Sequence, residues 1–308
     1  MNRAAETLQR RAEILKLVRI LEREPDELAY LEAVSLDDLR ALRELTTDVL
    51  WSANSGTLNR LAAASKLLPV GLTATIAQRA FGPLLAARMT GLLEPSRAVE
   101  IAAKLPIGFL TDVAIELDPR RASSVLGLVA PQQVEAITRE LVRRREHVAM
   151  GRFVGHLSDA ALRAALAVMD DETLLQVGFV LEDKDRLERL VSLLPKPRVT
   201  GIILAAAHAN LWLEALDLLG HLSPPRQNDI VAGAPELDHA ALEDIVSAVV
   251  EHELWAEVVV IAKRDATLQG KLAQRLSALP ARQRKALARR LQADGSIERL
   301  GALGQVLT

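Results

Sequence analysis

The chain contains no cysteine and few aromatic residues. Its 308 residues include no Cys, and Phe, Trp and Tyr together make up only 3%. Without cysteine, disulfides, thiolate metal sites and thiol nucleophiles are excluded. The scarcity of aromatic side chains leaves few surfaces on which the bases of single-stranded nucleic acid could stack.

Long hydrophobic runs are also missing. The longest uncharged run, "VTGIILAAAHANLWL" at 199–213, has 15 residues, and a bilayer span needs roughly 20. We therefore expect this run to form a buried core helix. Charged residues also interrupt the first 25 residues, including Arg10, Arg11, Glu13 and Lys16, and leave no apolar core for a secretion signal. These features predict a cytoplasmic protein.

Motifs for nucleotide binding and catalysis are absent. The sequence has no GxGxxG, GxxxxGK[ST], GxSxG or HExxH pattern, and its six histidines form no HxxxH pair. Three acidic residues at 170–172 could in principle bind a cation, but acidic residues at this spacing are also typical of a helix start. We expect a protein that is not an enzyme and that has no cofactor or resident metal.

What the sequence does have is a regular succession of helix signals. Half of its residues are hydrophobic, mostly Leu, Ala, Val and Ile, which favours helices. Prolines recur every 11 to 13 residues, at Pro95, Pro106, Pro119 and Pro131. Proline is tolerated in the first helical turn, where the N–H that it lacks would have no partner. Each proline therefore predicts the start of one short amphipathic helix, such as those with Ala98 and Ile101 or with Ala122 and Val125.

Capping residues continue this succession where proline is absent. Ser158, Asp170 and Asp183 each stand before an apolar segment, and their side chains can accept bonds from free N–H groups of a first turn. A near-constant period in a helical chain is typical of stacked repeats, and two helices with their turns give a unit of roughly 24 residues. The sequence thus predicts an all-α fold, an α-solenoid or superhelix of about 18–22 short helices of the armadillo or HEAT kind.

Three regions can be distinguished by composition. Residues 1–92 are predicted to form an N-terminal capping and apolar lobe, 93–222 a proline-punctuated repeat region, and 223–308 a C-terminal helical lobe. The first helix could cap the stack or form a short coiled-coil dimer. The segment 49–93 carries only basic charges, so it could form packed helices or lie on a membrane surface.

Two units, "LEPSRAVEIAAKLP" and "LDPRRASSVLGLV", open with the same L-x-P-x-R-A pattern. In this pattern the chain resembles the helical-repeat N-terminal cytoplasmic domain of MgtE-type magnesium transporters, and a related armadillo-like stack occurs in flagellar motor switch proteins. The resemblance implies a fold of stacked short helices and a regulatory or docking role. We find no segment that matches the transmembrane or nucleotide-binding-like parts of such a transporter, so the resemblance does not imply transport.

Charge is unevenly distributed near the C-terminus. Residues 227–262 contain eight carboxylates and no Lys or Arg, whereas 271–290 contain seven basic residues and no acid. The two stretches could neutralise each other if they lie side by side. Alternatively, Arg282, Lys285 and Arg289, spaced i, i+3, i+7 on one helical face, could meet an acidic partner.

The expected function is therefore that of a non-enzymatic helical-repeat protein that binds another protein as a scaffold, adaptor or regulatory module. The candidate partner-binding residues are basic. They are Arg143, Arg144, Arg145, Arg282, Lys285 and Arg289. The alternative is a protein that binds a membrane surface or nucleic acid through the same basic residues, although a pI near 6.3 disfavours nucleic acid.

Overall fold

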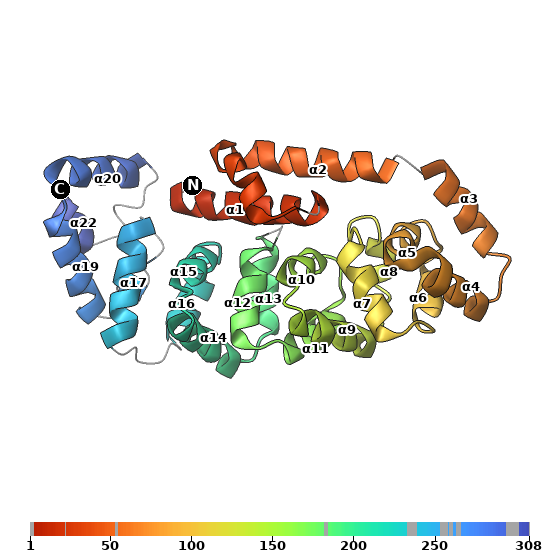
Figure 1. The fold of residues 1–308 in the computed structure, drawn as a ribbon. Helices are drawn as coiled ribbons and strands as arrows, with labels where there is room; N and C mark the ends of the chain where they lie inside the picture. The colour runs from red at the N-terminus through yellow and green to blue at the C-terminus, as the bar shows by residue number, and fades with distance from the viewer. Residues whose placement is uncertain are drawn as a thin grey trace. The chain divides into compact units, whose positions relative to one another are not determined.

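The structure is a computed structural model that describes residues 3–21, 23–52, 55–181, 184–232, 239–252, 258, 261–262, 266–293 and 302–307. All regular structure in these residues is helical, without a single strand (Figure 1). The all-α prediction is thus confirmed for the described part of the chain. The number of helices there also lies within the expected range.

The chain divides into two compact units. The N-terminal unit comprises Arg10–Arg186, and the C-terminal unit comprises Met1–Gln9 together with Leu187–Thr308. The compositional division at residues 92 and 222 stays a prediction.

The N-terminal unit consists of short helices in close succession. They are α1 (Arg3–Leu21, from Arg10 onward), the 3-10 helix η1 (Pro25–Ala33), α2 (Leu36–Ser52), α3 (Ser55–Ser65), α4 (Val70–Ile76), the π-helical turn η2 (Ala77–Phe81), α5 (Gly82–Thr90), α6 (Pro95–Ala102), α7 (Ile107–Glu116), α8 (Ser123–Leu126), α9 (Pro131–Arg143), α10 (His147–Phe153), α11 (Asp159–Val168) and α12 (Asp171–Phe179).

In this unit most helices pack against the helix two places along the chain. Contacts link α3, α5, α7, α9 and α11 into one row, and they also link α4 to α6, α6 to α8, and α10 to α12. Helices α5, α7, α9 and α11 begin at residues 82, 107, 131 and 159, which are 24 to 28 residues apart. This spacing of helix starts is close to the roughly 24 residues predicted for a pair of helices.

Proline marks helix starts in three of the four predicted places. Pro95 and Pro131 occupy the first turns of α6 and α9, and Pro106 immediately precedes α7. The prediction for Pro119 is wrong, because a turn follows it and α8 spans only Ser123–Leu126. The Asp118 carboxylate accepts the Arg120 N–H at 3.1 Å and holds the chain in that turn.

Polar caps open the next helices as expected. The Ser158 hydroxyl accepts the Ala161 N–H at the start of α11, and the Asp170 carboxylate accepts the Thr173 N–H at the start of α12 (2.7 Å). Capping is thus the role of Asp170, as predicted. The predicted cap Asp183 lies outside the described residues.

Close approach of α10 to α12 depends on Gly151. A Cβ atom at this position would lie 2.9 Å from the Val180 Cγ2 atom and 3.3 Å from the Val177 carbonyl oxygen. Nearby, Phe153 of α10 packs with Ala87 and Val113 in the buried apolar core of this unit. The short helices are therefore held by side chains from their neighbours, as their length requires.

The C-terminal unit continues the helical succession. Its helices are α13 (Arg186–Leu193, from Leu187 onward), α14 (Lys196–His208), α15 (Trp212–Gly220), α16 (Pro224–Ala232), α17 (His239–His252), α19 (Ala266–Ala278), α20 (Ala281–Ala293) and α22 (Ala302–Leu307). Contacts link α15 to α17, α17 to α19, and α22 to both α19 and α20. Leu268, Leu272 and Leu276 form the fully buried stripe of α19.

The uncharged run 199–213 is not the single buried helix that its composition predicted. Helix α14 ends at His208, and Asn210 takes the left-handed conformation (φ 54°). The Leu211 N–H then donates to the Ala206 carbonyl (2.9 Å) and terminates the helix. Only Ala206 of α14 is buried, and Leu204 is 39% exposed. Across the described residues, we find no helix with the length and apolarity that a bilayer span requires.

Candidate functional site

The three arginines at the end of α9 differ in their ion-pair partners. The Nε atoms of Arg143 and Arg144 each donate to the Glu140 carboxylate at 2.8 Å, and Arg144 also pairs with Asp112 of α7. The hydrogen bonds and charges of these two arginines lower the pKa of Glu140 to about 2. Arg143 and Arg144 are therefore engaged within their own unit.

Arg145, in contrast, is exposed and has no ion-pair partner among the described residues. It takes the left-handed conformation (φ 58°) just after α9. Its N–H donates to the Val142 carbonyl and the next N–H, of Glu146, donates to the Leu141 carbonyl, both at 3.0 Å. This is a Schellman cap, a position that favours glycine. An arginine here presents its charge to solvent at some cost in backbone strain.

The three candidate residues of α20 share one face, as the spacing predicted. Arg282, Lys285 and Arg289 fall within an arc of roughly 60° and span roughly 10 Å along the axis. All three are exposed, whereas Leu287 of the same helix is buried. Within the described part of the chain none of them forms an ion pair or side-chain hydrogen bond.

The acidic and basic C-terminal stretches form ion pairs with each other. Glu243 of α17 pairs with Lys271 of α19 at 2.5 Å and with Arg275 at 3.9 Å. The expected pairing is thus present between α17 and α19. The acidic residues Glu236, Asp238, Glu253 and Glu257 lie outside the described residues.

A second charged cluster, not predicted from the sequence, lies inside the N-terminal unit. Glu13 of α1 accepts from Lys16 Nζ (2.8 Å) and from Arg43 Nε of α2 (2.8 Å). The side chains of all three are at most 8% exposed. Burial raises the pKa of Glu13, but the charges and hydrogen bonds of Lys16 and Arg43 together bring that pKa below its usual value. The result is a buried ion triad.

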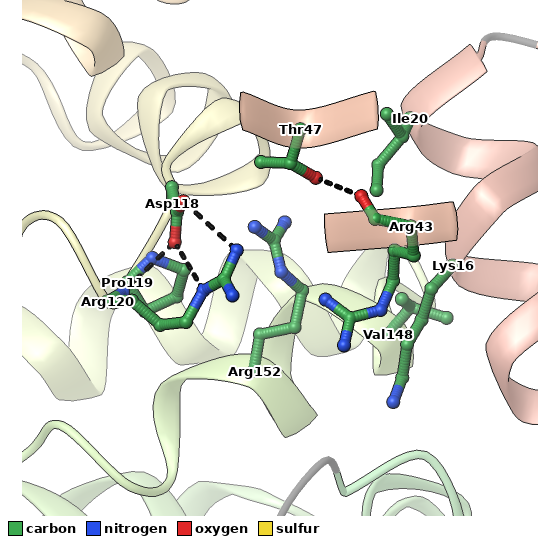
Figure 2. A pocket seen from close by; sticks show the side chains of 9 residues that line it. All are labelled: Lys16, Ile20, Arg43, Thr47, Asp118, Pro119, Arg120, Val148 and Arg152. Carbon is green, nitrogen blue, oxygen red and sulfur yellow. Dashed lines mark hydrogen bonds and ion pairs between the residues drawn. The ribbon is translucent and has the colours of Figure 1, made fainter. Parts of the chain in front are cut away.

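The turn before α8 contributes further charged side chains near this ion triad. Asp118 pairs with Arg120 (3.4 Å) and Arg121 (3.3 Å), and the Arg121 guanidinium also pairs with Asp48 of α2. Burial raises the pKa of Asp118, but Arg120 and Arg152 lower it to a net value below the usual one. Lys16, Arg43, Asp118, Arg120 and Arg152 all line one small cleft (Figure 2).

The sequence offered one signal for this cluster. Glu13 and Lys16 interrupt the apolar positions of the first helix, and both are buried beside Leu17. Charged residues in a buried stripe require partners, but partners such as Arg43 come from α2. Nothing in the spacing along the chain identifies them.

Among the described residues, no group of three or more His, Asp or Glu side chains is arranged to hold a metal ion. Burial and the charge of Arg145 lower the pKa of His147, which leaves it neutral near pH 7.

Comparisons with protein families, characterised proteins and solved structures give no match for this chain. No family is therefore identified, and the resemblance to the transporter domain remains one of sequence pattern.

Proposed function

We propose that this chain is a non-enzymatic helical-repeat protein, an α-solenoid of the armadillo or HEAT kind, that acts as a scaffold or adaptor by binding an acidic segment of another protein. The observation that carries this proposal is the face formed by Arg282, Lys285 and Arg289, hereafter the α20 basic face. These three cations are exposed and have no partner among the described residues.

The packing pattern supports the solenoid part of the proposal. Contacts between alternate helices and the recurrence of helix starts every 24 to 28 residues are what stacked helix pairs produce. Each pair contributes exposed side chains to a continuous surface. Such surfaces are commonly used to bind other proteins.

The α20 basic face fits a short acidic segment. Its length of roughly 10 Å corresponds to about three residues of extended chain. Exposed ion pairs contribute about 0.2 to 1 kcal/mol each. Three of them would therefore change an affinity by about 0.6 to 3 kcal/mol, or about 3- to 150-fold. Arg145 is a further exposed cation, in the N-terminal unit.

The test is a binding measurement with the full chain and a labelled acidic peptide of about 12 residues, long enough to cover the face. Fluorescence anisotropy at low and physiological salt gives Kd for wild type and for Arg282→Glu/Lys285→Glu/Arg289→Glu. We expect binding that weakens with salt and a loss of at least about threefold in the triple variant.

A matched control is available in the N-terminal unit. Arg60, Arg79 and Arg163 are exposed cations on three different helices, so Arg60→Glu/Arg79→Glu/Arg163→Glu changes the net charge equally without touching α20. Equal losses in both triple variants would mean that net charge, not the α20 basic face, governs binding. Tighter binding to anionic vesicles or duplex DNA than to the peptide would instead favour the membrane or nucleic-acid alternative.

A further inference from the structure

The segment 49–93 combines positive charge with exposed apolar side chains. It contains four basic residues and no Asp or Glu, although acidic residues make up 40 of the 308 residues of the chain. Helix α3 packs into the N-terminal unit through Leu58 and Ala62, which are buried with Met89 of α5. This packing explains the inner side of the segment, but it explains neither the absence of carboxylates nor the leucines that remain exposed.

One of these leucines, Leu67, lies in the turn between α3 and α4 and is 87% exposed. The turn itself is held by several hydrogen bonds. The Arg97 guanidinium of α6 donates to the carbonyls of Ser65 and Leu68, both at 2.5 Å, and the Leu67 N–H donates to the Ala64 carbonyl at 3.1 Å. The exposed Leu67 side chain is therefore presented by an ordered turn.

Helix α4 and the π-helical turn η2 extend this exposed surface. Leu72, Ile76 and Arg79 follow each other at i, i+4 and i+7, so they lie on roughly one face. Leu72 is 48% exposed and Arg79 is exposed, whereas Ala74 on the other side of α4 is buried. We name this surface the α4 surface and define it by Lys66, Leu67, Leu72 and Arg79.

The α4 surface lies at one end of the helix rows. Helix α4 is the first member of the row that continues through α6 and α8, and α3 is the first member of the row that continues to α11. Figure 1 shows both helices at one end of the N-terminal unit. The end helices of a stacked-repeat protein usually have a polar outer face, because no further repeat covers them. Exposed leucines at this end therefore indicate a surface that contacts something else.

The charge of the α4 surface disfavours a second copy of the chain as its occupant. Lys66 and Arg79 are exposed, and within the described part of the chain neither forms an ion pair. Lys66 does act on Glu94, but that carboxylate caps α6, and hydrogen bonds from Ser96 and Arg97 are the main cause of its lowered pKa. Two copies would place the same basic residues against each other, whereas an anionic surface would attract them.

Among anionic surfaces, a membrane fits the α4 surface best. A stable protein interface involves about 20 to 30 residues on each side, and only a few apolar side chains are exposed here. A nucleic-acid backbone would pair with the basic residues but leave Leu67 and Leu72 in water. A bilayer surface accepts both kinds of side chain, because apolar groups enter the boundary of the acyl chains while Lys and Arg remain at the charged headgroups.

We propose that the α4 surface binds peripherally to an anionic membrane. Leu67 and Leu72 enter the boundary of the acyl chains, and Lys66 and Arg79 remain with the lipid phosphates. This function goes beyond the binding of an acidic segment by the α20 basic face, which belongs to the other unit. A scaffold with both surfaces would hold its protein partner at a membrane.

The test is co-sedimentation of the full chain with vesicles of phosphatidylcholine and phosphatidylserine in a ratio of about 3:1, and with phosphatidylcholine alone. We expect reversible binding to the anionic vesicles that weakens with salt, and little binding to the neutral ones. Leu67→Gln should weaken the binding about tenfold, because a leucine no longer leaves water. Lys66→Gln/Arg79→Gln should weaken it about tenfold or more.

Matched controls remove the same kinds of side chain elsewhere in the N-terminal unit. Leu128 is 56% exposed in the turn before α9, and Arg139 and Arg163 are exposed on α9 and α11. Leu128→Gln and Arg139→Gln/Arg163→Gln should therefore bind vesicles as the wild type does. The triple variant of the α20 basic face should also bind them normally, so this proposal and the proposed function can fail independently.

The absence of cysteine allows a direct test of insertion. Leu67→Cys provides a single site for an environment-sensitive fluorophore. Its emission should shift to the blue with anionic vesicles, and lipids with nitroxide-labelled acyl chains should quench it. The same label at Leu128→Cys should show neither effect.

Several results would overturn the proposal. One is no binding to anionic vesicles at physiological salt, and another is equal binding by the Leu67→Gln and Leu128→Gln variants. Loss of vesicle binding only in the triple variant of the α20 basic face would assign the membrane contact to α20 instead. A fluorescence change at Leu67→Cys with the acidic peptide but not with vesicles would indicate a protein as the occupant.

Discussion

Replacing Glu13 with Gln removes the one carboxylate that holds the buried ion triad together. The change keeps the size of the side chain and removes the carboxylate that Lys16 and Arg43 share. Their side chains are 3% and 8% exposed, so water can do little to compensate. Breaking a buried pair in this way costs about 3 to 5 kcal/mol.

This magnitude is large enough to read in urea. With a denaturant slope of about 2 kcal/mol per molar, a loss of about 4 kcal/mol lowers the midpoint by about 2 M. Circular dichroism gives the midpoint. Hydrogen exchange in α1 and α2 peptides shows whether the loss is in the N-terminal unit.

The control for this prediction is Glu135→Gln, which removes an exposed carboxylate. Glu135 pairs with Arg139 at 2.7 Å, but the side chains are 39% and 65% exposed, and we expect a loss below about 0.5 kcal/mol. A second variant, Glu13→Leu/Lys16→Met/Arg43→Met, removes all three charges and should lose less stability than Glu13→Gln alone. If Glu13→Gln loses no more than Glu135→Gln, the triad is not the buried, mutually dependent cluster described above.

Three further predictions concern the helix ends, the helix packing and pH. Arg145→Gly should raise the free energy of unfolding by about 1 kcal/mol, because glycine adopts the left-handed conformation without strain. The thermal midpoint should therefore rise, and an unchanged or lower midpoint would contradict this prediction. Gly151→Ala should lower the free energy of unfolding by about 1 to 3 kcal/mol in urea denaturation, because the new Cβ would meet Val180. The control is Gly270→Ala, at a helical position where a Cβ has nothing within 4 Å, which should raise the free energy of unfolding by about 0.5 to 1 kcal/mol. In the folded protein the pKa values of Glu13, Asp118 and Glu140 are lowered, that of Glu140 to about 2. The stability that these shifts contribute is fully present above the unfolded carboxyl pKa of about 4 and is lost as pH falls through the pKa values of the folded protein. Urea midpoints should therefore fall steeply from about pH 4 to pH 2, and constant midpoints over this range would contradict the assigned ion pairs.

Helix starts could be predicted from the sequence because capping is a local interaction. Pro95, Pro131, Ser158 and Asp170 each act on N–H groups within three residues, and each marks a helix start in the structure. The prediction of a helix start at Pro119 was wrong because a proline in a turn and a proline in a first helical turn share the same local conformation. The Asp118 side chain, not the proline, decides between them here.

The charged clusters were harder to predict because their partners are distant in sequence. Arg43 and Glu13 are 30 residues apart, and Arg121 and Asp48 are 73 apart. The i, i+3, i+7 spacing placed Arg282, Lys285 and Arg289 on one face because a helix is periodic. In "RRR" no such rule separates Arg145 from its two neighbours, since the Schellman turn and the Glu140 partner appear only in three dimensions.

The most direct test of the fold concerns the alternate packing of the helices. Leu162 of α11 is 2% exposed, and α11 contacts α9 extensively. Native-state hydrogen exchange of Leu162→Ala should show loss of protection in α11 together with α9, and a smaller change in α10 and α12. Loss of protection in α10 and α12 with α9 unchanged would contradict the proposed two-helix repeat.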